Sequence, residues 1–441
     1  MLYFDIETNA IDFWPTLAGL KDLHCISIYD PDASKMHSFS SNANNLDEGV
    51  AMLNASHNIC GHNAINFDAP ALRKLGYEIT ARVVDTKVMS QVMHPDLFTE
   101  DCRRGEEFPK NLRGRHSLKA WGLRLGNEKD DHGATEDWTQ WSQEMQDYCE
   151  QDVNVVVDLF LHFMSGKPSA DMLFLEHDFA ELMTQQEING WPFDIKKANE
   201  LAEELMARRA ELRDQLQDMF PSTTEEMKTP KGWTVEVDGK SYTAATKGGL
   251  KLVLKENKLK QVLADKAVKT GNKTKTIPFN PNSRDQIAER LMKMGWEPEA
   301  YEGKRPKIDE AVLKEIDKPE AKLLLEYLLI SKRLGQVAEG RQGWLTLVRD
   351  GRIHGEVNTN GAVTGRCTHS KPNVAQVPAS RAVYGSQCRD LFTAPEGKVL
   401  VGADASGLEL RCLAHYLYPY DKGVYGKTII EGDIHTANQQ A

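Results

Sequence analysis

The first seven residues constrain the fold of this chain more than any other segment. They form an alternating pattern in which a strand would place Leu2, Phe4 and Ile6 on one face. Asp5 and Glu7 would then share the opposite face. Two carboxylates on one side of a strand repel each other unless a cation lies between them, and oxygen ligands suit Mg²⁺ or Mn²⁺. The alternative is a solvated edge face, which the pair alone does not exclude.

Two further segments each contribute an acid to the same pattern. Asp68 stands just before an apolar, helix-like run, and Tyr148 and Asp152 lie four residues apart, which places them on one helix face. The valines and leucines that follow Asp152 bury the rest of that helix. Acids that face away from a core and toward one another are explained by two metal ions about 3.5–4 Å apart, which activate water and stabilise an in-line phosphoryl displacement.

The order of these motifs, Asp-x-Glu, then Asn-x-x-x-x-Asp, then Tyr-x-x-x-Asp, resembles the DEDDy 3′→5′ exonucleases, whose fold is ribonuclease-H-like. The resemblance implies that Asp5 bridges both metal ions, that Glu7 and Asp152 complete one site, and that Asp68 serves the other. It implies that Tyr148 orients the attacking water. Val84-Asp85-Thr86 also matches a position of that family, and we interpret Asp85 as structural.

A second motif lies near the end of the sequence. Val401–Arg411 joins an apolar strand to a turn and a helix start, and Asp404 at the end of the expected strand can hold a metal ion or simply cap the helix. This stretch resembles motif A of family-A DNA polymerases, in the version found in replicative polymerases of T-odd tailed phages. The resemblance extends along nearly the whole chain, through His116–Gly122, Asn189–Asp194, Phe279–Asp285, Gly361–Arg366, Pro372–Pro378 and Gly432–Thr436.

The resemblance to these polymerases implies roles for five residues. Asp404 would coordinate the catalytic metal ions, and Glu409 would lie under the sugar and exclude a 2′-hydroxyl. Arg366 and Gln376 would probe the minor groove of the primer–template, where A·T and G·C pairs both offer acceptors. His435 would lie near the triphosphate. The residues alone favour plainer roles, a turn salt bridge for Arg366 and a packed side chain for His435.

We therefore predict an α/β multidomain protein. A ribonuclease-H-like DEDDy 3′→5′ exonuclease domain occupies residues 1–167, where strand-like and helix-like runs alternate. A helical, thumb-type region follows at 168–340. In that region Asp194 is expected to cap one helix and Ser283, with Gln286, to start another in a capping box. Residues 341–441 form a partial polymerase palm that includes motif A.

A Lys-rich insertion at about 221–278 interrupts the helical region. Between Phe220 and Phe279 there are twelve lysines, no arginine and six acids, although the whole chain carries a net charge of −11. Lysines on a flexible loop would contact phosphates without sequence preference; the alternative is a solvated surface loop. The resemblance places here a thumb insertion that in some relatives binds host thioredoxin, so a processivity factor of this kind is a candidate partner.

The sequence after His435 lacks two parts that a family-A polymerase needs. These are a fingers helix with basic residues for the triphosphate and a second palm carboxylate, without which Asp404 would be an under-ligated metal site. The sequence stops at Thr436–Ala441 without a helix stop signal. We expect a split polymerase in which a second polypeptide supplies these parts, and the alternative is a fragment. The chain alone would then degrade DNA, and dNTPs would be used only with the partner.

Three classes of function remain. The leading one is the N-terminal part of a phage replicative DNA polymerase with a proofreading exonuclease that uses two Mg²⁺ or Mn²⁺ ions and binds primer–template and single-stranded 3′ ends. The second is a stand-alone DNA exonuclease with a polymerase-derived DNA-binding region, and the third is a non-catalytic module. The seven cysteines are dispersed and no apolar run crosses a bilayer, which predicts the reducing cytoplasm of a bacterial host.

Overall fold

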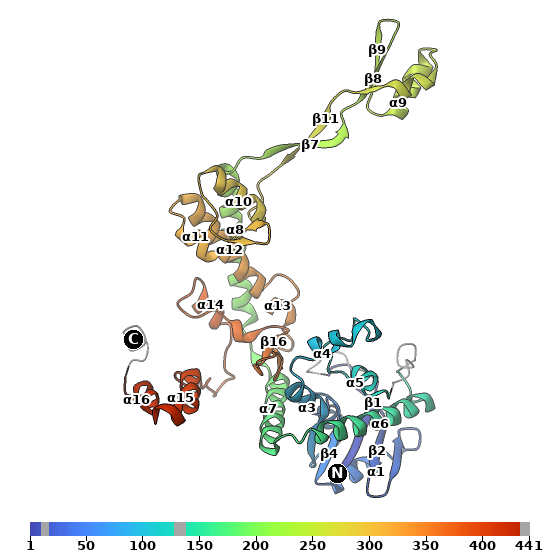
Figure 1. Cartoon of the computed structure of the whole chain (residues 1–441), viewed down its shortest axis with the longest axis vertical. Coiled ribbons are helices and arrows are strands. Elements are labelled where there is room, and N and C mark those ends of the chain that lie inside the picture. The colour runs from blue at the N-terminus through green and yellow to red at the C-terminus, as the bar shows by residue number, and fades with distance from the viewer. Residues whose placement is uncertain (10–16, 128–137, 433–441) are drawn as a thin grey trace. The chain divides into compact units, whose positions relative to one another are not determined.

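A computed structural model describes residues 1–9, 17–127 and 138–432 of the chain (Figure 1). The backbone divides into two compact units, Met1–Phe392 and Thr393–Ala441. All seven cysteines are free thiols. Across the described ranges, no helix combines the length and the apolar character needed to span a membrane.

The first unit begins with a five-stranded mixed sheet in the order β3-β2-β1-β4-β5. Strand β1 pairs antiparallel with β2 and parallel with β4, which leaves it in the middle of the sheet. Its side chains therefore face packed layers on both sides rather than solvent. The strands are β1 Leu2–Thr8, β2 Leu23–Asp30, β3 Lys35–Ser40, β4 Asn58–Gly61 and β5 Arg82–Asp85.

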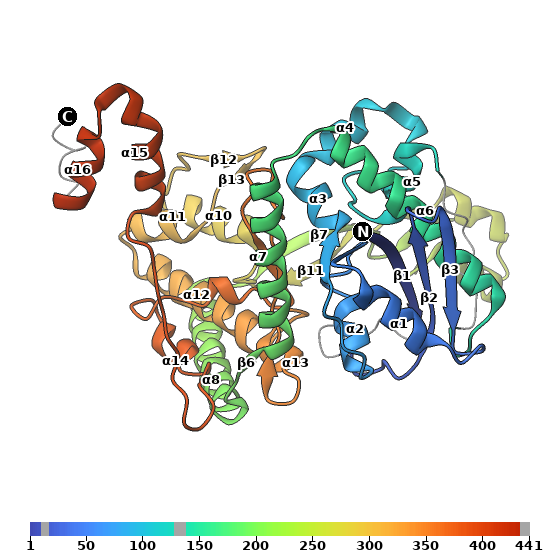
Figure 2. The same ribbon diagram turned by 90° about the horizontal axis from the view of Figure 1, so that it is seen from below.

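Helices cover the two faces of this sheet (Figure 2). On one face, Phe4 and Ile6 are buried with Leu53 of α1 (Leu46–Ala55). On the other face, the ring of Tyr3 packs edge-on against Phe160 of α6 (Gln143–Ser165), with 5.6 Å between the ring centroids. The predicted alternation of this strand is confirmed. Helix α2 (Asp68–Lys74) packs on the first face, and α3 (Thr86–Met93), α4 (Leu97–Arg103) and α5 (Leu118–Leu125) pack with α6 on the second.

A helical region with its own core follows. Helices α8 and α12 pack against each other through buried leucines such as Leu205 and Leu334. Asp194 caps α8 by accepting a hydrogen bond of 3.0 Å from the Lys197 N–H, as predicted. Ser283 caps α10, but the Gln286 side chain accepts from the N–H of Asn280 rather than from that of Ser283. The helices are α7 Ala170–Asn189, α8 Ile195–Met219, α10 Arg284–Lys293, α11 Glu310–Glu315 and α12 Pro319–Val337.

The Lys-rich module, residues 221–278, is folded, so the expectation of a flexible loop is wrong. Strand β7 (Thr223–Pro230) pairs antiparallel with β11 (Asn272–Ile277) and forms a two-stranded ribbon. Beyond the ribbon, three strands and α9 (Lys247–Glu256) enclose a core of Val235, Leu250, Leu254 and Ala264. The three strands are β8 Trp233–Val237, β9 Lys240–Ala244 and β10 Val268–Lys269.

The first unit ends in short elements that fold back onto the helical region. Strand β14 (Arg352–Ile353) pairs with β6 (Trp191–Pro192), and Phe193, Trp344 and Phe392 form a cluster of edge-on aromatic rings. The polymerase-type hairpin then follows, which we define as β15 (Glu356–Asn358), β16 (Thr368–Ser370) and their connecting turn. The short helices here are α13 Trp344–Leu347 and α14 Gly385–Arg389.

The second unit contains two helices that contact each other, α15 (Leu408–Asp421) and α16 (Val424–Glu431). The segment before them, expected as a strand ending at Asp404, is irregular, so this expectation is wrong. Val401 is 88% exposed. A strand is stabilised by hydrogen bonds to a neighbouring strand, and no strand within the described ranges pairs with this segment.

Candidate active site

Strand β1 places two of the predicted metal ligands side by side. Carboxylate oxygens of Asp5 and Glu7 and the Cys149 sulfur all lie within 4.8 Å of one another. The Cys149 thiol donates to the backbone carbonyl of Asp5 at 3.4 Å. Burial raises the pKa of this thiol well above its usual value, and its hydrogen bond with Cys25 and the charges of Asp5 and Glu7 raise it further. The thiol therefore stays protonated, and the two carboxylates are the ligands on offer.

Asp68 reaches the same strand from the start of α2. Its side chain is 5% exposed. Burial, and then the charge of Asp85, raise the pKa of Asp68 to about 7, with a smaller contribution from Asp152. Hydrogen bonds from its own N–H and from the N–H of Ile6 act in the opposite direction. The contact with Ile6 brings the Asp68 carboxylate to strand β1, which also carries Asp5 and Glu7.

Helix α6 contributes the last two predicted residues. Asp152 is 5% exposed and close enough to Asp68 to influence its pKa. Tyr148 lies one turn earlier on the same helix, next to Cys149, and its ring packs edge-on against Trp138 with 6.2 Å between the centroids. Helix α6 packs directly against β1 and β2. The structure thus gathers four carboxylates around β1, with a tyrosine on the same side of α6.

The donor set fits hard divalent cations. It consists of carboxylate oxygens, which Mg²⁺ and Mn²⁺ prefer. Like charges in a buried site disfavour ionisation, which is one reason why the pKa of Asp68 is raised. A bound cation would relieve this repulsion. Asp5, Glu7, Asp68 and Asp152 are therefore the residues that would hold such ions.

The Asp85 carboxylate accepts hydrogen bonds from the loop that leads to Asp68. One oxygen of its carboxylate accepts hydrogen bonds from the N–H groups of Asn63 and Lys87, both at 2.8 Å, and the other accepts from Ile65 at 3.0 Å. Asn63 has a positive φ of 63°, a conformation that most residues avoid. These contacts agree with the interpretation of Asp85 as a structural residue.

The raised pKa of Asp68 leads to a prediction about stability. The folded protein binds a proton on the Asp68 carboxyl more tightly than the unfolded chain does. The stability that this protonation contributes is therefore lost as pH rises from about 4 through about 7. In EDTA, the melting temperature should therefore fall between pH 5 and pH 8. Asp68→Asn should remove this slope and raise the melting temperature at pH 8, the change in unfolding free energy being at most about 4 kcal/mol.

Scanning calorimetry in EDTA across this pH range measures the effect. Asp32→Asn, which changes an exposed acid in a surface turn of the same sheet, is the matched control. Parallel pH profiles for Asp68→Asn and the unchanged protein would contradict the assignment of a buried, repelled carboxylate at this position.

The residues predicted to serve polymerisation are divided between the two units. Arg366 and Gln376 are exposed residues of the first unit, Arg366 in the turn of the polymerase-type hairpin and Gln376 just after it. Asp404 and Glu409 are exposed residues of the second unit. Within the described ranges, Asp5, Glu7 and Cys149 are the only group of three or more metal-binding side chains brought together. His435 lies outside the described residues.

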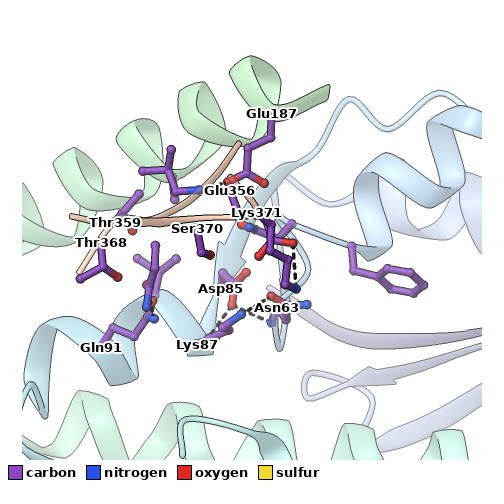
Figure 3. Close-up of a pocket in the computed structure, with 16 residues that line it drawn as sticks. Asn63, Asp85, Lys87, Gln91, Glu187, Glu356, Thr359, Thr368, Ser370 and Lys371 are labelled. Carbon is purple, nitrogen blue, oxygen red and sulfur yellow. Dashed lines mark hydrogen bonds and ion pairs between the residues drawn. The ribbon is translucent and has the colours of Figure 1, made fainter. Parts of the chain in front are cut away.

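A pocket of about 650 Å³, which no sequence motif indicated, lies beside the Asp68 loop (Figure 3). Its walls come from the loop around Asn63, from α3, from α7 and from the polymerase-type hairpin. Lys87, Glu187 and Lys371 are among its charged residues. No spacing motif links residues so far apart in the sequence. The one available signal was Lys87, a lysine in an otherwise apolar helix start.

Comparisons with known proteins connect these features to a family. The sequence profile of DNA polymerase family A matches residues 252–440. The whole chain is 36% identical to the DNA-directed DNA polymerase of Escherichia phage T7 and 35% identical to that of Enterobacteria phage T3, and it covers 73% of each phage protein. The thermostable DNA polymerase I of Thermus aquaticus is 35% identical over 31% of this chain and 17% of its own length.

A solved DNA polymerase structure has a similar fold. The POL domain of Pol1 from M. smegmatis, in complex with DNA primer-template and dNTP, matches with a TM-score of 0.60 over 94% of this chain and 58% of its own. The sequences are 15% identical, so this likeness concerns the fold alone. The resemblance to family-A polymerases of tailed phages is confirmed by the two phage enzymes, which match along the entire sequence. The chain belongs to DNA polymerase family A.

Proposed function

We propose that this chain acts in replication of bacteriophage DNA as part of a DNA-directed DNA polymerase, and that its N-terminal sheet carries a 3′→5′ proofreading exonuclease. The observation that carries the exonuclease proposal is the convergence of four carboxylates around β1. Asp5 and Glu7 lie on the strand, Asp68 accepts a hydrogen bond from the same strand, and Asp152 influences the pKa of Asp68. The polymerase proposal rests on the relatives from two phages.

In this proposal the four carboxylates would hold divalent ions, which would activate water and offset the negative charge of the scissile phosphate. A water molecule, oriented by the Tyr148 hydroxyl, attacks the terminal phosphodiester in line. The bond to the 3′ oxygen of the preceding nucleotide breaks, that oxygen takes up a proton, and a nucleoside monophosphate leaves. Burial of Asp68 and Asp152 keeps their oxygens in fixed positions, which reduces the reorganisation needed during the reaction.

For polymerisation, the proposed roles follow the family. Asp404 and His435 would serve the metal ions and the triphosphate, and Glu409 would exclude ribonucleotides. Arg366 and Gln376 would contact the minor groove of the primer–template, where acceptor positions are shared by all correct base pairs. The exposed side chains of Arg366 and Gln376 agree with a DNA-facing role.

A primer–template with a label at the 5′ end of the primer tests both parts of the proposal. In Mg²⁺ without dNTPs, we expect stepwise shortening of the primer, and EDTA should stop it. With dNTPs, a lengthened primer supports polymerase activity of the chain. Shortening without extension supports a DNA exonuclease with a polymerase-derived DNA-binding region. An intact primer in Mg²⁺ and in Mn²⁺ would contradict the exonuclease proposal.

The Lys-rich module gives a separate prediction about DNA binding. If its exposed lysines contact phosphates, each contact releases counterions, and removing three lysines should make the dependence of log K on log salt shallower by up to about 2.7. Fluorescence anisotropy of labelled duplex DNA at several salt concentrations measures this slope. The three changes are Lys255→Gln, Lys258→Gln and Lys275→Gln.

The matched control removes three exposed lysines from the helical region instead. It should leave the slope nearly unchanged, because these side chains are expected to face solvent in the DNA complex. Equal slopes for the two triple variants would mean that the module is a solvated surface with no special affinity for DNA. The control changes are Lys196→Gln, Lys304→Gln and Lys314→Gln.

A further inference from the structure

Lys87 stands at the first turn of α3 and reaches the loop that carries Asp68. Its Nζ donates to the side-chain oxygen of Asn63 at 2.8 Å, while its N–H donates to the Asp85 carboxylate. Asn63 is therefore hydrogen-bonded twice: its backbone N–H donates to Asp85, and its side-chain oxygen accepts from Lys87. Both contacts fix the start of the loop that leads to Asp68.

The surroundings of Lys87 are buried and acidic. Burial lowers the pKa of Lys87, and the charges of Asp85, Glu187 and Glu356 act against this lowering. These three acids come from different parts of the chain, namely the end of β5, α7 and β15. Figure 3 shows Lys87 rising from α3 toward this group, with Asn63 beside it. Lys87 and Glu356 line the same pocket, and Glu356 also pairs with the ammonium group of Lys371 at 3.0 Å.

The hairpin is tied to the same place by further hydrogen bonds. Glu187 accepts from the backbone N–H of Val357 in β15. The side chain of Gln91, one turn after Lys87 on α3, donates to Asn358 at 2.6 Å. The hairpin strand β15 is therefore hydrogen-bonded to α7 and to α3, the helix that also carries Lys87.

Helix α7 is fixed to the same network through His177. Its Nδ1 lies 2.7 Å from the carbonyl of Leu173 and must donate to it, so its Nε2 is the acceptor for the N–H of Asp85 at 2.8 Å. The ring is thereby held as one neutral tautomer. The backbone of Asp85 is anchored to α7 while its carboxylate holds the Asp68 loop, so hydrogen bonds through Asp85 join α7, β5 and the loop.

We propose that Lys87 is a positioning residue that couples the polymerase-type hairpin to the Asn63–Asp68 loop of the exonuclease site. The proposal rests on the proposed function, because Asp68 matters only if the carboxylates act on DNA. Its ligand class is duplex primer–template, which would engage the exposed turn of the hairpin at Arg366. Engagement there is transmitted through β15 and Lys87 to the loop, so that the placement of Asp68 differs between duplex-bound and free protein.

Hydrogen exchange of the full chain tests this coupling without relying on activity. In EDTA, which prevents cleavage, a primer–template duplex is added and exchange of the Asn63 and Ile65 amides is followed by mass spectrometry. In the unchanged protein we expect the duplex to change the exchange rate of these amides by at least about threefold, a coupling of ordinary size. Lys87→Met keeps the buried stem but removes the charge, and it should abolish the response.

Two further variants keep the test decisive if Lys87→Met is unstable. Lys87→Arg keeps a charged donor and should retain most of the response. Asn358→Ala changes an exposed residue of the hairpin and removes its hydrogen bond from Gln91 of α3. It should weaken the response. Lys110→Met, an exposed lysine of the same sheet domain, is the control and should respond like the unchanged protein.

Cleavage of single-stranded DNA in Mg²⁺ adds a second readout. A displaced Asp68 should lower kcat by about 10-fold in Lys87→Met with KM nearly unchanged, because misplaced catalytic groups cost rate rather than ground-state binding. An exchange response of Lys87→Met equal to that of the unchanged protein would overturn the proposal. If the unchanged chain shows the exchange response and Lys87→Met lacks it, but neither cleaves DNA, the coupling stands and the proposed exonuclease function fails.

Discussion

Asp5→Asn is expected to reduce cleavage of single-stranded DNA by about 10³–10⁴-fold, because in the proposed function it removes a metal ligand worth several kcal/mol of transition-state stabilisation. Asp5 lies on the central strand of the sheet, and its oxygens are close to those of Glu7. Asparagine has the same shape but carries no charge. The fold should therefore survive while the affinity for divalent ions falls.

Single-turnover cleavage of a 5′-labelled oligonucleotide over a range of Mg²⁺ concentrations measures this loss. Asp147→Asn is the matched control, because Asp147 stands just before Tyr148 on α6 and is exposed. It should cleave at the rate of the unchanged protein. An Asp5→Asn variant that retains activity within about tenfold would mean that the carboxylates around β1 are not the site of hydrolysis.

Arg124→Met is expected to destabilise the N-terminal domain by about 3–5 kcal/mol, because it removes the cation that makes two hydrogen bonds to a buried carboxylate. Arg124 and Asp101 are 1% and 0% exposed. They form two parallel hydrogen bonds of 3.0 and 2.7 Å, and the Gly114 N–H donates to the same carboxylate at 2.8 Å. The guanidinium also lies over the ring of Trp121, 4.7 Å from its centroid.

The pKa of Asp101 supports this expectation. Burial alone would raise it, but the hydrogen bonds from Arg124 and Gly114 and the charge of Arg124 bring it below its usual value. Its pairing therefore stabilises the fold above the usual carboxyl pKa, and this contribution is lost in acid as the carboxylate is protonated. Without Arg124, the same carboxylate keeps only the Gly114 N–H and the more distant Arg104, 3.9 Å away.

Calorimetry is the appropriate measurement, because a chain with several cores need not unfold in one step. The transition of the N-terminal domain should move to lower temperature in Arg124→Met, while Arg103→Met, at an exposed position of α4, should leave it in place. The double variant Arg124→Met/Asp101→Leu should melt above the single one, since no buried charge remains. A single variant that melts with the unchanged protein would show that the pair contributes little.

Local patterns predicted much of the N-terminal domain. Alternation in the first strand was sufficient to place Phe4 and Asp5 on opposite faces, because side chains of a strand alternate whatever the tertiary context. The spacing of Tyr148 and Asp152 placed them on one side of a helix for an equally local reason. The cap at Asp194 followed from its position before a helical run, and the structure confirms it.

Predictions failed where stability depends on distant partners. The twelve lysines of the Lys-rich module suggested a loop, but a small core needs only a few apolar residues, here including Leu250 and Leu254. An apolar run at Val399–Asp404 suggested a strand, yet a strand forms only against a neighbour. Lys87 was missed because its partners come from three remote segments, which no local spacing can bring together.

The paired strands β7 and β11 have a consequence for how such a gene can change. Thr223 and Ile277 are opposite each other in the ribbon, so the chain leaves the helical region and returns to it at adjacent points. The buried residues of the Lys-rich module and those of the helical region form separate clusters. Because closing a short gap costs little chain entropy, recombination can remove, exchange or replace everything between these two residues while the host helices keep their packing. The ribbon is therefore a position at which a polymerase lineage can gain or exchange an accessory domain while the helical core stays unchanged.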